Sequence, residues 1–336
     1  MTSRDRWLLR LLQLALLALV GWGLYRALAG QLSQLTWAQL RRVGAPAPGM
    51  LLLSTLMLLA AYLWHAMLWR RITADVGGGR TSLRASLHAY FVSSLGRYIP
   101  GKLWQLAGLA VLAGRAGLAP SRAVAASLFG QLGFLTTGLL FLGLSLPDLA
   151  ARVNAGTLHG LNPILLASVL AVGAAVVIWL LAATRLGRSL HGWAERRLGR
   201  RMGQRVATTM AIADEVAPGR ALLWAAGYAL SWLLFGAAFV VFVRAFAPVP
   251  PAYVVATAGT VAASYLAGYL FFLTPAGLGM REAAMGLLLA QFLTPGQAAV
   301  IAVLSRLWFT AGELLPLALI PLLPRGAAAP SASGVV

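Results

Sequence analysis

Long apolar runs separated by short polar segments dominate this sequence. Runs without Asp, Glu, Lys or Arg cover residues 11–25, 43–69, 123–147, 153–184, 221–243 and 245–280. Most of these runs reach the roughly 20 apolar residues that a helix needs to cross a bilayer. The period-two alternation bounded by turns that is typical of membrane β-strands is absent from the sequence. We therefore predict an all-α polytopic membrane protein.

The apolar pattern predicts about six full spanning helices in one transmembrane domain over residues 1–325, with a disordered tail over 326–336. The basic segment 185–220 carries eight arginines. It is either a solvated cytoplasmic loop or a helical pair on the membrane surface, where arginine attracts anionic lipid. We expect the spanning helices over about 7–25, 50–69, 123–146, 163–183, 221–243 and 297–323.

Two further apolar segments contain a Pro/Gly break. The first has arms over residues 86–98 and 103–112, and the second has arms over 253–273 and 278–291. Arms as short as those of the first segment cannot cross a bilayer alone. We therefore expect two re-entrant helical hairpins, whose irregular backbone must be surrounded by protein or by a water-filled cavity. The sequence leaves open whether the arm 253–273 turns back or spans fully.

The two broken segments repeat one order of events at a constant offset of 175 residues. We interpret this register as an internal repeat, with one copy over about 50–146 and the other over about 221–323. Chance alignment is the alternative, because many identities fall on common apolar residues. Paired breaks in corresponding halves point to a substrate site in transporters. The aligned identities include Tyr90/Tyr265, Pro100/Pro275, Pro120/Pro295 and Phe134/Phe309.

The charged residues indicate how the chain is oriented in the membrane, and they leave the predicted class of protein unchanged. The chain is 60% hydrophobic and 10% charged, with a net charge of +19. Its cations flank apolar runs, as orientation signals do, so we exclude nucleic acid as a partner. Most of them fall on the face that carries both chain termini, which the positive-inside rule places in the cytoplasm. The first hairpin then opens from the cytoplasm and the second from outside, so the repeats are inverted.

Residue sets for catalysis or for cofactor binding are missing from the sequence. There is no cysteine, and the four histidines are scattered without metal-ligand spacing. Residues 96–102 fit the phosphate-loop pattern by letter, but Leu103 replaces the required Ser or Thr and Pro100 interrupts the loop. We expect no cofactor, no metal and no enzyme activity. A transferase acting on a polyprenyl or sugar lipid is disfavoured, because the chain has only eight acidic residues.

Four cations are expected at membrane depth, where each charge costs about 2.5–3.5 kcal/mol and so needs a reason. Arg97 and Lys102 flank the first break, Arg281 follows the second, and Arg306 lies in the last helix. A helix that begins after each break points its unpaired N–H groups and positive dipole end into the protein. These features together predict an anion site suited to a phosphate.

Two acidic residues, Glu282 and Glu313, are expected at the same depth. Arg306 and Glu313 are seven residues apart, so they share one helix face. In one interpretation these three residues and Arg281 form a buried ion-pair cluster that closes the second hairpin onto the last helix. In the other, a carboxylate meets a cationic head group or a proton while the arginines bind phosphate.

Three runs carry a family resemblance: SSLGRYIPGKLWQLAG at 93–108, TPAGLGMREAAMGLLL at 274–289 and LSRLWFTAGELL at 304–315. They resemble the lysylphosphatidylglycerol synthase transmembrane region family of bacterial and archaeal membrane proteins, over about residues 7–323. In bifunctional members this region is the flippase that moves aminoacylated phosphatidylglycerol between leaflets. A separate cytoplasmic domain of those members transfers the aminoacyl group.

The resemblance implies a stand-alone lipid-translocating module in the bacterial cytoplasmic membrane, because this sequence stops at Val336 without a synthase domain. Ala276 replaces the first glycine of the usual Pro-Gly-Gly-Leu-Gly motif, which puts a direct backbone role there in doubt. The family's motif residues correspond to Arg97, Pro100, Gly101, Lys102, Pro275, Gly277, Gly279, Arg281, Glu282 and Arg306. The candidate substrate site adds to these Tyr98 and Trp104, beside the first break, and Glu313.

We therefore expect a flippase that moves a phosphate-bearing lipid, anionic or aminoacylated, through a mid-membrane cationic cavity between two broken helices. Its partners would be membrane phospholipids or other phosphate-bearing lipids. The alternative is a non-transporting subunit of a cell-envelope lipid enzyme or glycosyltransferase, with residues 185–220 as the docking surface. The sequence leaves open the lipid, the direction, the energy source and whether the protein forms a homo-oligomer.

Overall fold

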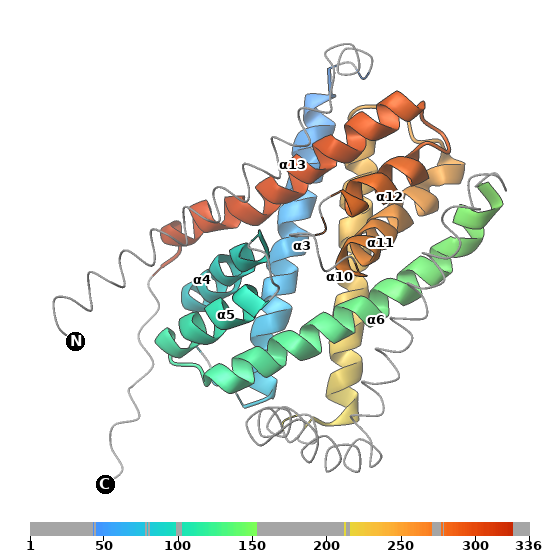
Figure 1. The fold of residues 1–336 in the computed structure, drawn as a ribbon. Coiled ribbons are helices and arrows are strands. Elements are labelled where there is room, and N and C mark those ends of the chain that lie inside the picture. Colours follow the sequence, from blue (N-terminus) through green and yellow to red (C-terminus); the bar gives the residue numbers. More distant parts are fainter. Residues whose placement is uncertain are drawn as a thin grey trace, which may run out of the picture.

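The computed structural model describes residues 43, 45–77, 79, 81–98, 103–152, 212, 216–270, 277 and 279–324. Every regular element in these ranges is helical, which confirms the all-α class for the part described (Figure 1). Short 3-10 turns follow α4, precede α11 and follow α13. The helices are α3 (Pro48–Asp75), α4 (Leu83–Ser94), α5 (Leu103–Arg115), α6 (Pro120–Arg152), α10 (Pro218–Arg244), α11 (Val254–Leu270), α12 (Met280–Leu289) and α13 (Pro295–Leu319).

Four helices, α3, α6, α10 and α13, are long and apolar enough to cross a membrane. They correspond to four of the predicted spanning helices. The expected helices over 7–25 and 163–183, the tail over 326–336 and most of the basic segment 185–220 lie outside the described residues. The count of six spans and the division into two repeats therefore stay predictions.

The helix α6 extends past the third predicted span. The span was expected over about 123–146 and corresponds to Pro120–Gly143, whereas the helix continues through Pro147 to Arg152. Proline removes one helical hydrogen bond and can kink a helix without ending it. Proline does mark the other end of these elements, because α3, α6, α10 and α13 each begin at a proline. Its fixed φ suits the first turn of a helix, where its missing N–H would have no partner.

The antiparallel pair of α3 and α10 runs through the middle of the molecule (Figure 1). At one end the backbone N–H of Ala47 donates to the carbonyl of Ala245, at 2.7 Å. At the other end the indole Nε1 of Trp224 donates to the Asp75 carboxylate, at 3.1 Å. These two contacts fix which end of α3 lies beside which end of α10.

Aromatic rings of α10 pack directly on the backbone of α6. The ring of Trp232 stacks on Phe134 with centroids 4.1 Å apart, and its Nε1 donates to the Phe134 carbonyl at 2.8 Å. A methyl group at Gly138 would come within 2.6 Å of the Trp232 ring. Small residues of this kind let helices approach closely inside a membrane.

The two broken segments form helical hairpins: hairpin one is α4 and α5, and hairpin two is α11 and α12. A Cβ at Gly96 would come within 2.6 Å of the Gln105 backbone nitrogen, and one at Gly277 within 2.7 Å of the Gly268 Cα. The arms of each hairpin therefore touch through backbone close to the break. The breaks themselves, residues 99–102 and 271–276, lie outside the described residues.

The hairpins are attached at opposite ends of the α3–α10 pair. Hairpin one follows the Asp75 end of α3, whereas hairpin two follows the Arg244 end of α10. The arms α4, α5 and α12 have 12, 13 and 10 residues, fewer than the roughly 20 that a full span needs. Their depth in a membrane stays a prediction.

The packing of α6 on α10 gives a direct test. We expect Gly138→Ala to lower the free energy of unfolding by about 1–3 kcal/mol, because the added methyl group overlaps the Trp232 ring. The measurement is thermal unfolding of the purified protein in detergent, followed by tryptophan fluorescence.

Gly143→Ala is the matched control on the same helix. A Cβ at Gly143 meets no atom within 4 Å, and this glycine is exposed. The control should unfold at the same temperature as the parent or slightly higher, since alanine is the better helix former by up to about 1 kcal/mol. Equal effects of the two substitutions would contradict the packing argument.

Candidate functional site

A cavity of about 240 Å³ lies where the two hairpins meet α3, α6, α10 and α13. Five lining residues come from hairpin one, namely Tyr90, Arg97, Tyr98, Gln105 and Leu106, and hairpin two contributes others between Val261 and Arg281. The polar and aromatic residues of its lining are Tyr62, His65, Tyr90, Arg97, Tyr98, Gln105, Ser127, Gln131, Phe134, Trp232, Phe235, Tyr265, Tyr269, Arg281, Arg306, Phe309 and Glu313.

Matched positions of the two aligned segments line this cavity together. The offset of 175 residues rests on sequence identities alone, such as Tyr90/Tyr265. In the structure both members of several aligned pairs face the same space, including pairs that differ in residue type. These pairs are Tyr90/Tyr265, Leu106/Arg281, Gln131/Arg306 and Phe134/Phe309.

Arg97 and Glu313 form an ion pair between hairpin one and α13. The distance from Arg97 Nη1 to Glu313 Oε1 is 2.7 Å, and the two side chains are 27% and 7% exposed. The hydroxyl of Tyr98 donates to Glu313 Oε2 at 2.7 Å, and that of Tyr62 donates to Oε1 at 3.0 Å. Both carboxylate oxygens are therefore satisfied, as a buried charge requires.

A second, looser ion pair joins hairpin two to the same helix. Arg306 Nη1 lies 3.8 Å from Glu282 Oε1, and these side chains are 5% and 11% exposed. The other carboxylate oxygen of Glu282 accepts the Gly279 backbone N–H at 2.7 Å, which caps the start of α12. Gly279 has a φ of 83°, a conformation that glycine adopts without steric cost.

Arg281 is held differently from the other two arginines of the cavity. Its Cζ lies 5.4 Å from the ring centroid of Tyr265 and 5.2 Å from that of Phe309. Among the residues that the structure describes, no acidic side chain forms an ion pair with it. Ring faces attract a guanidinium but leave its charge in place. This site can therefore bind an anion, and the planar N–H fork of arginine suits a phosphate.

Six of the predicted site residues line the cavity: Arg97, Tyr98, Gly277, Arg281, Arg306 and Glu313. Glu282 lies in a small adjoining cavity between Arg281 and Arg306. Gly279 is exposed and outside the lining. Four others, Pro100, Gly101, Lys102 and Pro275, lie outside the described residues.

Trp104 does not line the cavity, and its predicted place there is wrong. Its side chain is 51% exposed, whereas the next two residues, Gln105 and Leu106, line the cavity. Successive residues of a helix are turned by about 100°, so a neighbour in sequence can face the opposite way. Closeness to the break in sequence therefore does not place Trp104 on the face of α5 that lines the cavity.

The ion-pair cluster considered from the sequence forms only in part. Glu282 pairs with Arg306, but Glu313 pairs with Arg97, on the other hairpin. Arg306 and Glu313 share a helix face, as expected, yet seven residues of helix separate them by about 10 Å. That spacing lets each one serve a different hairpin.

Several lining residues were not predicted from the sequence, among them Tyr62, His65, Gln105 and Gln131. Three of them, Tyr62, His65 and Gln131, lie in the apolar runs 43–69 and 123–147, which predict only spanning helices. For Gln131 a signal was present, because the offset of 175 aligns it with Arg306. For Tyr62 and His65 no comparable pattern exists.

The Arg97–Glu313 pair should show strong coupling in a double-mutant cycle. We expect Arg97→Met and Glu313→Gln each to lower the free energy of unfolding by about 3 kcal/mol, because each leaves an uncompensated buried group. The double variant should lose less than the sum of the two, with a coupling energy of about 1–3 kcal/mol. Denaturant unfolding in detergent micelles measures both quantities, and strict additivity would show that the pair is not formed.

No curated protein and no solved structure matches this chain. A family model described as the lysylphosphatidylglycerol synthase transmembrane region matches residues 10–311. This range includes both hairpins and the lining of the cavity between them except Glu313. The chain belongs to the lysylphosphatidylglycerol synthase transmembrane region family.

Proposed function

We propose that this protein is a lipid flippase, which moves a phosphate-bearing head group, anionic or aminoacylated, between the leaflets of a membrane. The observation that carries the proposal is Arg281, a cation that lines a cavity between two hairpins without an acidic partner among the described residues. An arginine placed at membrane depth needs a functional or structural reason. Binding of a lipid phosphate is such a reason.

Family membership and hydropathy support a location in a membrane, where a flippase must act. The chain is a multi-pass membrane protein of a family linked to flippase-like membrane domains. We place it in a bacterial cytoplasmic membrane with both termini in the cytoplasm, because most cations flank the helix ends on that side. No catalytic role is needed for lipid movement, and we propose none.

The opposed attachment of the hairpins supports movement between two faces. In transporters with inverted repeats, the substrate site lies where the repeats meet, and one repeat moves against the other to change the side of access. Here hairpin one is attached at the Asp75 end of α3 and hairpin two at the Arg244 end of α10. We infer re-entrant hairpins in inverted repeats, with the lipid tails kept in the bilayer while the head group passes the cavity.

Glu313 supplies the step that lets a head group pass Arg97. The phosphate would bind first at the N–H edge of Arg281. It would then replace the Glu313 carboxylate, which lies 2.7 Å from the Arg97 guanidinium in the ion pair. The displaced carboxylate would meet the ammonium group of an aminoacylated head group, or take up a proton. Tyr62 and Tyr98, which donate to the two oxygens of Glu313, would stabilise the carboxylate in the meantime.

The proposal requires that Arg281→Ala strongly slows head-group movement without unfolding the protein. The assay uses proteoliposomes that contain head-group-labelled phosphatidylglycerol and a membrane-impermeant quencher. We expect the rate of movement to fall about 10- to 100-fold, the loss that matches a charged hydrogen bond worth about 1.5–3 kcal/mol. Arg97→Ala should have a similar effect.

Arg115→Ala is the matched control, because Arg115 is an exposed arginine at the end of the same hairpin as Arg97. It should move lipid at the parent rate. Normal movement by both cavity variants would mean that the site is misplaced. Absence of movement in the folded parent protein, with anionic, zwitterionic and aminoacylated lipids, would favour the non-transporting subunit.

A further inference from the structure

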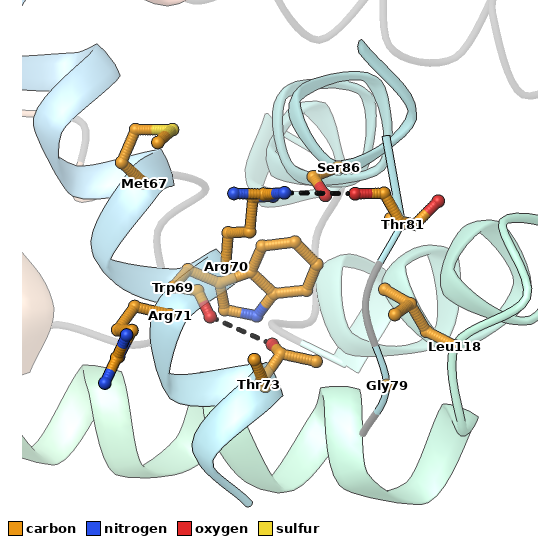
Figure 2. A pocket seen from close by; sticks show the side chains of 10 residues that line it. Met67, Trp69, Arg70, Arg71, Thr73, Gly79, Thr81, Ser86 and Leu118 are labelled. Carbon is orange, nitrogen blue, oxygen red and sulfur yellow. Dashed lines mark hydrogen bonds between the residues drawn. The ribbon is translucent and has the colours of Figure 1, made fainter. Parts of the chain in front are cut away.

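A second pocket of about 330 Å³ lies at the Asp75 end of α3, between α3, the start of α4 and the loop before α6 (Figure 2). Its lining includes Trp69, Arg70, Thr81, Ser86 and Leu118. Neither the family nor the proposed movement of lipid assigns a role to it. We call it the outer pocket, because on α3 and α4 it lies one helical turn from residues of the central cavity, His65 and Tyr90.

Three polar atoms of the outer pocket are buried without a hydrogen-bond partner: Trp69 Nε1, Arg70 Nε and Ser86 Oγ. The side chains of Trp69 and Ser86 are 2% and 1% exposed. An indole and a guanidinium can only donate, and a serine hydroxyl can donate as well. Buried donors without an acceptor destabilise a fold, so proteins seldom keep three in one place. The three atoms belong to residues that line the pocket, and each can donate to an acceptor bound beside it.

The charge of the outer pocket favours an anion as that acceptor. Arg70 Nη2 donates to the Thr81 carbonyl at 3.1 Å, which holds the guanidinium across the gap between α3 and the start of α4 (Figure 2). Among the described residues that line the pocket there is no acidic side chain. The nearby carboxylate of Asp75 already accepts from Arg71 and Trp224. The described lining therefore carries positive charge, from Arg70 and Arg71, together with unpaired donors.

The position of Arg70 along α3 indicates where the anion comes from. From Pro48, the first residue of α3, to Arg70 is 22 residues, or about 33 Å of helix. This length matches the roughly 30 Å thickness of the hydrocarbon core. Arg70 then lies at the level of the lipid head groups. We propose that the outer pocket binds the phosphate of a phospholipid head group, with Trp69, Arg70 and Ser86 as its donors.

An aromatic pair separates this pocket from the central cavity. The rings of Trp69 and Tyr90 have centroids 5.7 Å apart, and Tyr90 belongs to the lining of the central cavity. The donors of the outer pocket are thus distinct from Arg97, Arg281 and Arg306. Binding here does not require that lipid is moved, so it can hold or fail independently of the proposed function.

The test measures binding of two probes to the full chain in a maltoside detergent, in the Arg281→Ala background, which removes the cation at which the proposed central site first binds phosphate. The probes are short-chain phosphatidylglycerol and inorganic phosphate, and the readout is the concentration that produces half of the rise in unfolding temperature. We expect the lipid probe to stabilise the protein. The double variant Trp69→Phe with Ser86→Ala should bind it at least about tenfold more weakly, because it removes two donors to the phosphate and keeps the packing.

The same double variant separates binding from a structural role. Without probe it should unfold at the parent temperature or above, because it removes two buried donors that have no partner. Trp104→Phe, an equal ring change at an exposed tryptophan outside both pockets, should leave probe binding unchanged. A double variant that unfolds earlier yet binds the lipid probe at the parent concentration would overturn the proposal.

The two probes distinguish the sources of the phosphate. Binding of the lipid probe, alone or together with inorganic phosphate, and its weakening in the double variant support a head-group site. Binding of inorganic phosphate alone would overturn the assignment to lipid. Binding of neither would overturn the anion site. Because Arg281 is absent throughout and the comparison changes only residues of the outer pocket, none of these outcomes depends on whether the protein moves lipid.

Discussion

The cost of burying an arginine charge away from water governs the centre of this molecule. Three arginines line one cavity, and each is accommodated in a different way. Arg97 has a close carboxylate, Arg306 has a more distant one, and Arg281 lies against two aromatic rings. These arrangements form a series in which the positive charge is offset less and less. The cavity is consequently uneven, with its least neutralised cation on hairpin two.

The last long helix, α13, connects these arrangements. It carries Arg306 and Glu313, which reach hairpin two and hairpin one respectively, and Phe309, which lies between them in sequence and contacts Arg281. A displacement of α13 would therefore change all three arginine environments together. Polar contacts of this kind are expensive when incomplete, so the structure is expected to have few intermediate arrangements.

The sequence predicted those features that depend on local pattern. Apolar runs identified the four long helices that are described, and Pro/Gly breaks located both hairpins. Partners across the cavity could not be predicted, because Arg97 and Glu313 are 216 residues apart and meet only through the packing of the hairpins. The prediction for Trp104 was wrong because it relied on closeness in sequence: the next two residues line the cavity, whereas Trp104 is exposed. The constant offset of 175 residues also relates Gln131 to Arg306, and both residues line the cavity.

The bare backbone contact between Gly268 and Gly277 has a mechanical consequence. The two arms of hairpin two touch there without side chains between them, and the stem of Arg281 packs against Gly268. A contact between two glycines has no interlocked side chains to resist sliding, so a rotation of α12 on α11 would have its pivot here. Arg281 lies just beyond the pivot, at the start of a ten-residue helix. A small rotation would sweep its guanidinium through the cavity with the helix as a rigid arm, without a change of rotamer.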